Sequence, residues 1–273
     1  MSLPSPRRAA AGPSAGAPTA PNPRDLVAAL THGLAVIEAF DQDRPRLTIA
    51  EVAQRSGLTR AAARRYLITL QHLGYVSSER RLFGLTARVL RLGQSYVHSA
   101  RLPRSIDPEL QRLAHALREA SAAGVLVDDD VVCIAASRAG RLVSPAVQRG
   151  ARMPAYCSAS GRVLLGALPP ARLEAWLARQ ARAPLAPLTP YTITDLARLR
   201  HEIEQAREQG HAAVDQEFEL GMRTLAVPLL DFRGEVRAAL DVSADAARVS
   251  AAQLIAHCLA PLRQVQVILR GTL

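Results

Sequence analysis

The sequence predicts an α+β fold in which a winged helix-turn-helix is followed by a helix and then by a larger domain of mixed helices and strands. Three features indicate this: two short amphipathic helices about a glycine turn, an apolar–polar–apolar stretch directly after them, and paired strands between helices in the second half. Two helices about such a turn, with a hairpin beside them, form the device that places a helix in the major groove of DNA. A length of 273 residues suits two domains.

The first helix of the pair is predicted to begin after Thr48 and to end at Gly57. Thr48 and Glu51 have the spacing of a capping box, in which each side chain accepts a hydrogen bond from the backbone N–H of the other residue. Glycine is the residue that most readily adopts the left-handed conformation at the end of a helix. The apolar stripe of this helix consists of Ile49, Val52 and Ala53.

The second helix is expected to begin after Thr59, which can cap it, and its apolar residues Ala63, Leu67 and Leu70 recur with the spacing of a buried face. The opposite face is rich in arginine, which binds guanine O6 and N7 with two hydrogen bonds or holds a phosphate. A solvated arginine face is the alternative, but the cap, the glycine turn and the apolar stripe in register favour DNA binding. The DNA-binding candidates on the two helices are Thr48, Thr59, Arg60, Ala61, Arg64 and Arg65.

Residues 75–85 predict a β-hairpin wing, because an apolar pair, a polar turn and a second apolar stretch follow one another. Arg80 and Arg81 stand at the turn. We expect them to contact phosphates or the minor groove, and the alternative is that they are solvated turn residues. Their position beside the recognition helix favours contact with DNA.

A further helix is expected between Arg24 and Phe40, where apolar residues follow helical spacing. We predict that its apolar face braces the helix-turn-helix; the face consists of Leu26, Leu30, Leu34, Ala35 and Ile37. Residues 1–23 hold six prolines among Ala, Gly and Ser, a composition that cannot form a core. The sequence therefore predicts a disordered tail over residues 1–23 and a DNA-binding domain over residues 24–85.

Positive charge is concentrated in the N-terminal part of the chain. The formal net charge is +10: residues 1–103 hold 14 Arg and 6 acidic residues, a net +8, whereas residues 104–273 hold 20 Arg and 18 acidic residues, a net +2. Because the chain contains no lysine, its arginine total reflects genome composition as well as partners. The asymmetry nevertheless favours DNA binding, since phosphate attraction requires the charge on the DNA-binding part.

Residues 86–103 predict a linker helix that Pro103 closes. The sequence leaves two roles open for its apolar face, a contact in a dimer or part of a core within one subunit. This face consists of Val89, Leu92, Tyr96 and Val97.

Residues 104–273 predict a domain of antiparallel strands flanked by helices, an architecture typical of small-molecule sensors. A hairpin over residues 124–135 is expected to turn at the three aspartates 128–130, which are read as a solvated turn, with a cation site as the alternative. The other strands are expected at 224–230 and 235–243 about Arg233-Gly234, and the helices at 109–121, 158–168, 170–180, 194–209 and from Ser250 onward with a kink at Pro261.

Several other classes of protein are disfavoured. Cys133, Cys157 and Cys258 are widely separated, which supports neither a disulfide framework nor a metal site, and we expect no metal or cofactor. No apolar stretch is long enough to span a membrane. Arg7-Arg8 is followed by an alanine-rich stretch that Gly and Pro interrupt, so a twin-arginine signal is disfavoured and a cytoplasmic location is expected.

An enzyme is the alternative class of function. It would use Cys157 as a nucleophile, with a histidine such as His211 as the base and Asp215 as the acid, as in a thiol-dependent hydrolase. The segment Ser158-Ala159-Ser160-Gly161 lacks the Gly-x-Ser-x-Gly pattern of a nucleophile elbow. A buried, unreactive cysteine is the more common case, so no catalytic residue is expected.

The chain resembles the IclR family of bacterial transcriptional regulators over nearly all of its length after the tail. Three segments carry the resemblance: residues 60–67 (RAAARRYL), residues 150–165 (GARMPAYCSASGRVLL) and residues 215–228 (DQEFELGMRTLAVP). Residues 44–48 and 189–195 are also similar to the branch that controls protocatechuate, 4-hydroxybenzoate and β-ketoadipate pathway genes. A different carboxylate pathway is the alternative.

The resemblance implies a GAF-like effector-binding domain, a dimer or dimer of dimers, and a palindromic DNA operator near a catabolic promoter. The effector would be a small organic acid, aromatic or β-ketoadipate-like. Activation or repression, and contact with RNA polymerase, are left open. Carried over by position, the effector-binding residues are Tyr156, Ala159, Ser160, Gly161, Met222, Thr224, Asp241 and Ser243.

The start of the helix at Ser158 supports this site independently, because free backbone N–H groups at a helix start suit a carboxylate. The alternative for Ser160 is a helix cap, and for Ser243 a hydrogen bond at the end of a strand. Position 241 departs from the resemblance, since the branch often has Asn there. An acidic residue facing an anionic ligand is unfavourable.

Overall fold

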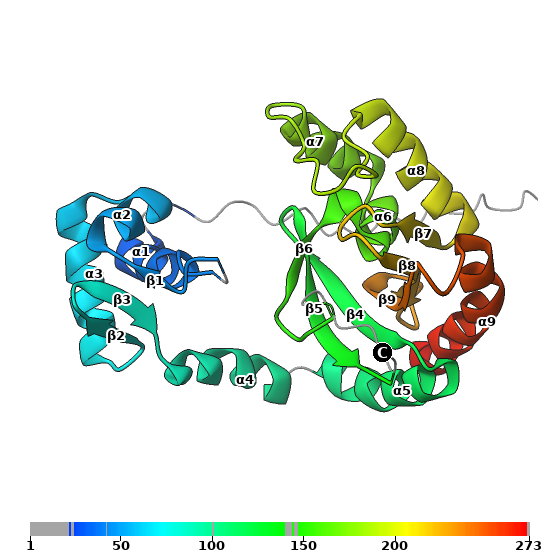
Figure 1. Ribbon diagram of the computed structural model, residues 1–273, viewed down its shortest axis with the longest axis horizontal. Helices are drawn as coiled ribbons and strands as arrows, with labels where there is room; N and C mark the ends of the chain where they lie inside the picture. The colour runs from blue at the N-terminus through cyan, green and yellow to red at the C-terminus, as the bar shows by residue number, and fades with distance from the viewer. Residues whose placement is uncertain are drawn as a thin grey trace, which may run out of the picture. The chain divides into compact units, whose positions relative to one another are not determined.

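The computed structural model describes residues 22, 25–41, 43–99, 101–139, 144 and 147–271. Apart from residue 22, the tail predicted for residues 1–23 lies outside this part of the chain. The chain forms two compact units, Met1–Leu92 and Gly93–Leu273, whose elements are labelled in Figure 1. In the described residues, no helix is long and apolar enough to cross a membrane.

The first unit is a three-helix module with a small antiparallel sheet. Its strands have the order β1-β3-β2, so β3 lies between the two others. The hairpin of β2 and β3 is the predicted wing, whereas the short strand β1 was not predicted. The elements are α1 (Ala28–Glu38), β1 (Arg46–Leu47), α2 (Ile49–Ser56), α3 (Arg60–His72), β2 (Val76–Glu79), β3 (Leu82–Leu85) and the 3-10 helix η2 (Ala87–Val89).

The local signals at α2 and α3 have the predicted effect. The Thr48 side chain accepts a hydrogen bond from the Glu51 N–H, and the Glu51 carboxylate accepts one from the Thr48 N–H, which completes the capping box. Gly57 ends α2 with a φ of 69°, and the Thr59 side chain caps α3 by accepting a hydrogen bond from the Ala62 N–H. The apolar residues of both helices are buried together with residues of the wing; this core includes Val52, Ala53, Ala63, Leu67, Leu70, Val76 and Phe83.

Helix α1 packs on this core with a different face from the one predicted. The structure leaves Leu26, Leu30 and Leu34 exposed by 56%, 64% and 46%, and buries Val36 and Ala39 instead. Apolar residues occur on nearly every side of this segment, so their spacing alone does not select the inner face. The prediction that Leu26, Leu30 and Leu34 brace the module is wrong.

The predicted linker helix also differs in its boundaries. Helix α4 spans Leu90–Ser99, and α5 spans Arg101–Leu117, so Pro103 lies in the first turn of a helix and does not close one. Proline is tolerated there because first-turn N–H groups have no partner within the helix. Pro108 lies further inside α5, and the segment 118–121 that was expected to be helical leads into strand β4.

The second unit is built on a six-stranded antiparallel sheet of order β6-β5-β4-β9-β8-β7. One face is covered by α5 and α9, and the other by α6, α7 and α8 (Figure 1). The strands are β4 (Ala120–Val127), β5 (Asp130–Ser137), β6 (Arg152–Pro154), β7 (Ala212–Asp215), β8 (Met222–Leu230) and β9 (Val236–Asp245), and the helices are the 3-10 helix η3 (Ala155–Cys157), α6 (Ala159–Gly166), α7 (Pro170–Gln180), α8 (Leu196–Gln209) and α9 (Ala251–Arg270).

The alternation of side chains along β9 decides which residues reach the site. Leu240 and Val242 belong to the core under α5 and α9, so Asp241 and Ser243 lie on the opposite face, toward α6. Asp241 is paired with Ala122 of β4 and Ala226 of β8, which places it in the middle of the sheet.

Most elements of this unit were predicted to within a few residues. The hairpin of β4 and β5 turns at Asp128 and Asp129 as expected, and Ser250 caps α9 in a capping box with Gln253. The edge strands β6 and β7, of three and four residues, were not predicted. Strands this short are hard to recognise from alternation, because they contain too few alternating positions.

Candidate functional site

The start of α3 presents an arginine-rich surface to solvent. Arg60, Ala61, Arg64 and Arg65 are all exposed, as is the capping residue Thr59. In the part of the chain that the structure describes, the three guanidinium groups have no acidic partner. They are therefore available to a polyanion.

Elsewhere in this unit, arginines are held by carboxylates. Arg46 forms an ion pair with Glu79 at 2.7 Å, and Arg55 forms one with Asp41. The contrast with α3 shows that the first unit pairs some of its arginines and leaves the recognition surface positive. Such a surface attracts phosphate at long range and binds it at contact.

Arg80 and Arg81 form the tip of the wing and are exposed. Both have a positive φ, 48° and 68°, which is the geometry of a two-residue hairpin turn of type I′. Thr48 is half-buried, and its hydroxyl is bound to the Glu51 carboxylate at 2.8 Å. Its established role in this structure is the capping of α2.

A hollow lies in the second unit between the start of α6 and the face of the sheet. Six of the eight predicted effector-binding residues line it, namely Ala159, Ser160, Met222, Thr224, Asp241 and Ser243. The structure adds seven lining residues that were not predicted: Ala122, Val147, Met153, Cys157, Ser158, Val214 and Phe218. Of these, Phe218 lies within the family segment 215–228, and Met153, Cys157 and Ser158 lie within the family segment 150–165. Val214 faces the hollow from a strand that was not predicted.

The hollow is narrow. It measures about 420 Å³ between its lining atoms and its mouth, but only about 20 Å³ is wide enough for the centre of a water molecule. That is room for roughly one water, since one needs about 10–15 Å³. An aromatic ring can therefore enter only when the lining residues move apart.

The first turn of α6 faces the hollow with two free amides. The Ser158 hydroxyl oxygen caps the helix by accepting a hydrogen bond from the Gly161 N–H at 3.1 Å. Of the three predicted amides, Gly161 is thus already bound. Within the described part of the chain the N–H groups of Ala159 and Ser160 have no acceptor, and the helix dipole makes this end positive.

Gly161 and Tyr156 are not among the residues that line the hollow, so their role as effector contacts stays a prediction. A Cβ atom on Gly161 would lie 2.1 Å from the Ala155 carbonyl oxygen, so only glycine fits against that backbone. The Tyr156 hydroxyl donates a hydrogen bond to the Ala186 carbonyl at 2.8 Å, and burial raises the pKa of Tyr156 to about 12. Both residues hold α6 in place beside the sheet.

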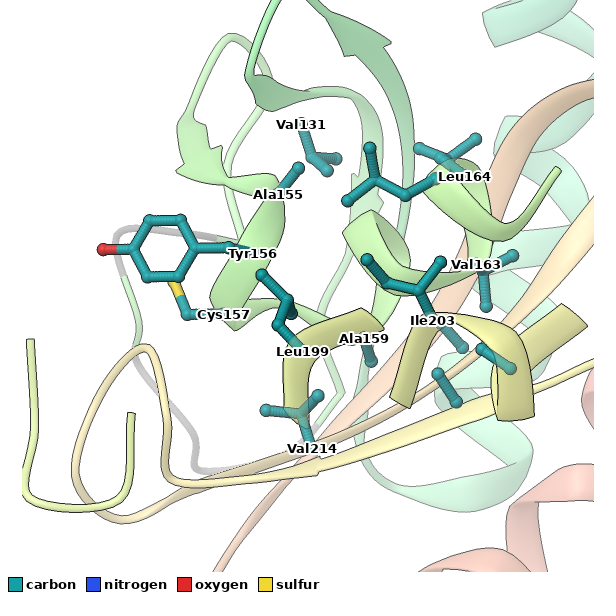
Figure 2. Close-up of a cluster of buried hydrophobic side chains, with 14 of the residues drawn as sticks. Val131, Ala155, Tyr156, Cys157, Ala159, Val163, Leu164, Leu199, Ile203 and Val214 are labelled. Carbon is teal, nitrogen blue, oxygen red and sulfur yellow. The ribbon is translucent and has the colours of Figure 1, made fainter. Parts of the chain in front are cut away.

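Helix α6 is buried along its whole length. Figure 2 shows Ala159, Val163 and Leu164 of this helix among Leu199 and Ile203 of α8 in one apolar cluster. Every residue of α6 is buried, including Arg162. A ligand at the first turn would therefore contact a helix that is fixed on all sides.

Asp241 is a buried carboxyl group at the floor of the hollow. Its exposed fraction is 4%, and the Ser160 hydroxyl donates a hydrogen bond to its Oδ2 atom at 2.6 Å. Burial raises the pKa of Asp241 to about 7, and the hydrogen bond from Ser160 opposes this rise. The predicted alternative of a helix cap does not apply to Ser160, because Ser158 caps α6.

A second buried carboxyl group, Glu217, has a cation as its partner. The Arg162 guanidinium donates two hydrogen bonds to the Glu217 carboxylate, at 2.7 and 2.8 Å, and Glu217 also accepts one from the Ile193 N–H. This pair ties α6 to the loop that carries Phe218, a residue that lines the hollow. An arginine within the apolar sequence of α6 is the signal that could have predicted it.

Thr224 and Ser243 complete the polar part of the lining. They are paired across β8 and β9, and their hydroxyl oxygens lie 3.0 Å apart. This side-chain contact lies two residues from the end of β9 and agrees with the alternative for Ser243, a hydrogen bond at the end of a strand. The hollow thus combines two amides, the four hydroxyls of Ser158, Ser160, Thr224 and Ser243, and one buried carboxyl with an apolar wall.

Cys157 does not have the surroundings of a nucleophile. Its side chain is buried, its thiol donates to the Pro154 carbonyl at 3.5 Å, and burial raises its pKa to about 12. A reactive thiol requires a lowered pKa. His211, the base of the enzyme alternative, is bound to the Gln209 carbonyl at 3.2 Å. No group of three or more metal-ligating side chains occurs among the described residues.

The two sites define a DNA-binding protein with a separate small-molecule pocket. The family model for the IclR helix-turn-helix domain matches residues 29–80, and the model for the bacterial transcriptional regulator IclR C-terminal domain matches residues 94–267. The chain belongs to the IclR family of transcriptional regulators. The predicted fold class, a winged helix-turn-helix followed by an α+β effector-binding domain, is confirmed.

The relatives of this chain include regulators of aromatic catabolism. The Pca regulon regulatory protein of Pseudomonas putida is 42% identical over 84% of this chain and 78% of its own length. The p-hydroxybenzoate hydroxylase transcriptional activator of Acinetobacter baylyi is 38% identical over 90% of this chain and 92% of its own. An IclR homologue from Microbacterium hydrocarbonoxydans, solved in complex with 4-hydroxybenzoate, is 25% identical over 88% of this chain and 96% of its own, with a TM-score of 0.70.

Proposed function

We propose that this chain is a ligand-responsive regulator of an aromatic-acid catabolic operon of the β-ketoadipate pathway type. It binds a palindromic operator as a dimer or a dimer of dimers and responds to a small organic acid. The observation that carries the proposal is the hollow at the start of α6, where two free amides and four hydroxyls face an apolar wall. Its regulatory relatives at 42% and 38% identity support the choice of pathway.

The proposed DNA contacts divide into two kinds. Arg64 and Arg60 at the start of α3 would reach base edges in the major groove, and Arg65 would hold a phosphate. Arg80 and Arg81 of the wing would contact the backbone or the minor groove. Thr59 and Ala61 lie at the same end of α3 and belong to the same proposed DNA contact. Thr48, at the start of α2, would set how α2 approaches the DNA backbone.

A dimer follows from the symmetry of a palindromic operator and has a candidate surface. Leu26, just before α1, and Leu30 and Leu34 of α1 are exposed, and α4 exposes Leu90 and Leu92. Exposed apolar patches mark protein–protein contacts. In the predicted linker face, Leu92 is exposed and Val89 is half-buried, and the side chains of Tyr96 and Val97 lie outside the described part of the chain. Of the two roles that the sequence left open for this face, we propose the dimer contact.

For the effector, we propose that its carboxylate binds the amides of Ala159 and Ser160 at the positive end of α6. Its ring would lie against Met222 and the other apolar lining residues, and a ring hydroxyl would meet Thr224 and Ser243. Regulation then requires that the effector bind one of two arrangements of the dimer more tightly than the other. The arrangement that matches the half-site spacing binds the operator.

The first test is the melting temperature of the full chain with protocatechuate, 4-hydroxybenzoate, β-ketoadipate and aliphatic acids, each added separately. A ligand that binds only the folded state raises the melting temperature. A rise confined to the first three acids supports the proposed pathway, and a rise with other acids only points to a different carboxylate pathway. No rise with any acid would remove the carboxylate pocket from the proposal.

A variant of Ser160 tests whether the effector binds in the hollow. Ser160→Trp should fill the hollow and abolish the rise in melting temperature, while operator binding in a gel-shift assay stays intact. A folded Ser160→Trp protein that responds normally would place the effector elsewhere.

A further inference from the structure

Asp241 lies beside the place where the proposed function puts a carboxylate. Ser160 supplies one of the two free amides of α6, and the hydroxyl of the same residue is bound to Asp241 at 2.6 Å. Both residues line the same hollow. An anion held by the Ser160 amide would therefore share a narrow, largely buried space with the Asp241 carboxyl group.

Among the described residues, the elements packed around Asp241 offer it no cation. It faces Ser160 from α6, Ala122 from β4 and Ala226 from β8, with Thr224 and Ser243 nearby. The titratable group on the β5 side is the Cys133 thiol, whose pKa is raised to about 12 by burial and by Asp241 itself.

The arginines of this region are bound elsewhere. Arg162 of α6 is bound to Glu217. Arg138 donates hydrogen bonds to the Val147 carbonyl, and Arg149 forms an ion pair with Asp107. Within the described residues, the hydrogen bond from Ser160 is thus the stabilising contact of the Asp241 carboxyl.

Two carboxylates in one buried space cannot both stay ionised without a cation, because their repulsion is only weakly screened there. One proton shared between them removes the repulsion and adds a hydrogen bond between the two groups. The ligand carboxylate is held in its ionised form by the amides of α6, so the proton resides on the side of Asp241.

We propose that this pocket binds a carboxylate effector only together with one proton, which Asp241 takes from solvent and donates as a hydrogen bond to the ligand. This inference rests on the proposed function, since it assumes that the effector is an acid bound at α6. Burial already brings the pKa of Asp241 to about 7, so the ligand-free protein holds the proton below neutral pH. Effector affinity is then coupled to pH through one side chain.

The experiment is calorimetric titration of the full chain with 4-hydroxybenzoate between pH 6 and pH 8.5, in two buffers that differ in ionisation enthalpy. For the wild type, Kd should be constant below about pH 7 and should rise about tenfold per pH unit above it. At pH 8 the difference in heat between buffers should correspond to the uptake of one proton. A constant Kd with no proton uptake at pH 8 would overturn the inference.

Two variants and one neutral ligand sharpen the test. Asp241→Asn keeps the shape of the side chain and should bind 4-hydroxybenzoate with a Kd that does not depend on pH and with no proton uptake. Ser160→Ala removes the hydrogen bond that favours the charged form of Asp241, so its loss of affinity should begin at a higher pH. 4-Hydroxybenzamide, which has no charge, should show no proton uptake with the wild type.

The failure of the inference can be told apart from the failure of the proposed function. Binding of 4-hydroxybenzoate without proton uptake would contradict the role of Asp241 and leave the regulator proposal intact. Failure of both the wild type and Asp241→Asn to bind any of the acids would contradict the carboxylate pocket itself, and the role of Asp241 with it.

Discussion

Helices α3 and α6 begin in the same way and are used in opposite ways. Each starts after a hydroxyl residue, Thr59 or Ser158, whose side chain accepts a hydrogen bond from an N–H of the first turn. Helix α3 presents its first turn to solvent, whereas all eight residues of α6 are buried. A helix start that meets a large partner has to be exposed, and one that meets a small ligand has to be enclosed.

The arginines of the two helices show the same difference. Arg64 of α3 is exposed and has no partner among the described residues, while Arg162 of α6 is buried against Glu217. An exposed, solvated arginine costs little to remove from the folded protein, and a buried paired arginine costs much. The contrast predicts which substitutions change stability and which change binding.

The largest expected effect is at Arg162. Arg162→Met leaves the Glu217 carboxylate buried without its cation and should lower the free energy of unfolding by about 3–5 kcal/mol. Urea unfolding followed by circular dichroism measures it. Arg64→Met is the matched control and should change stability by less than about 0.5 kcal/mol. Equal losses in the two variants would contradict the distinction between the helices.

The double variant Arg162→Met/Glu217→Leu separates the charge from the packing. If the unpaired carboxylate causes the loss, removing both charges should recover most of the stability of the single variant. If the double variant is as unstable as Arg162→Met, the loss arises from packing around α6.

The next effect is at Asp241, and its size depends on pH. The pKa of Asp241 is raised from an ordinary 3.8 to about 7, so between these pH values the folded state holds a proton that the unfolded state has released. Stability therefore falls as pH rises from 4 to 7 and stays at its lower level above 7. Asp241→Asn should be equally stable near pH 4 and more stable above pH 7, by up to about 4 kcal/mol.

Asp231→Asn is the control, for which the expected change in stability has the opposite sign. Burial raises the pKa of Asp231, but hydrogen bonds from the Glu235 N–H, the Arg237 guanidinium and the Arg233 N–H outweigh burial and lower it. Removing this carboxylate should reduce stability above pH 4 and not below. Thermal melts of both variants from pH 4 to pH 8.5 give the comparison, and curves parallel to the wild type would contradict it.

Gly161→Ala tests how tightly α6 is enclosed. The new Cβ atom would meet the Ala155 carbonyl oxygen at 2.1 Å, so the helix or η3 has to shift. We expect a loss at the upper end of the range for overpacking, about 1–3 kcal/mol, measured by thermal unfolding. On α3, Ala61→Ser should have almost no effect, because that side chain is exposed. A Gly161→Ala protein of wild-type stability would show that α6 is less confined than the structure indicates.

The smallest effect on stability, and a large one on binding, is expected at the exposed arginine. Arg64→Ala should weaken operator binding by about 1–3 kcal/mol if Arg64 contacts a base, with little change in the melting temperature. Affinities for the operator and for unrelated DNA, measured at several salt concentrations, tell a base contact from a phosphate contact. The loss of a phosphate contact weakens binding to both DNAs, whereas the loss of a base contact weakens binding to the operator. Unchanged operator affinity would exclude Arg64 from the DNA interface.

The two units differed in how well they could be predicted. The capping box at Thr48 and Glu51, the turn at Gly57 and the buried face of α3 depend on residues that lie within four positions of one another. Short-range signals of this kind are readable from sequence. The inner face of α1 was predicted wrongly, because apolar residues surround that helix and only packing against α2 and α3 selects Val36 and Ala39.

The residues of the pocket were predicted mainly through the resemblance, with the helix start at Ser158 as the one independent signal, and only in part. The resemblance supplied Ser160 and Asp241, but not the contact between them, which joins residues 81 positions apart. It also supplied Gly161 as a ligand contact, whereas the Ser158 cap occupies its amide and its role is close packing. No local pattern pairs Arg162 with Glu217, since 55 residues separate them.

The sequence by itself determined the helix-turn-helix, its exposed arginines, the wing and the mixed architecture of the second unit, because caps, turns and periodicity act over a few residues. The tertiary structure decided which face of α1 is buried and which amides of α6 are free. It also decided that one buried carboxyl, Glu217, has a cation, while the other, Asp241, has none in the part of the chain that the structure describes. These features depend on contacts between helices and strands that lie far apart in the sequence. The charge and protonation of a buried group are set by such neighbours, and the order of residues along the chain does not specify them.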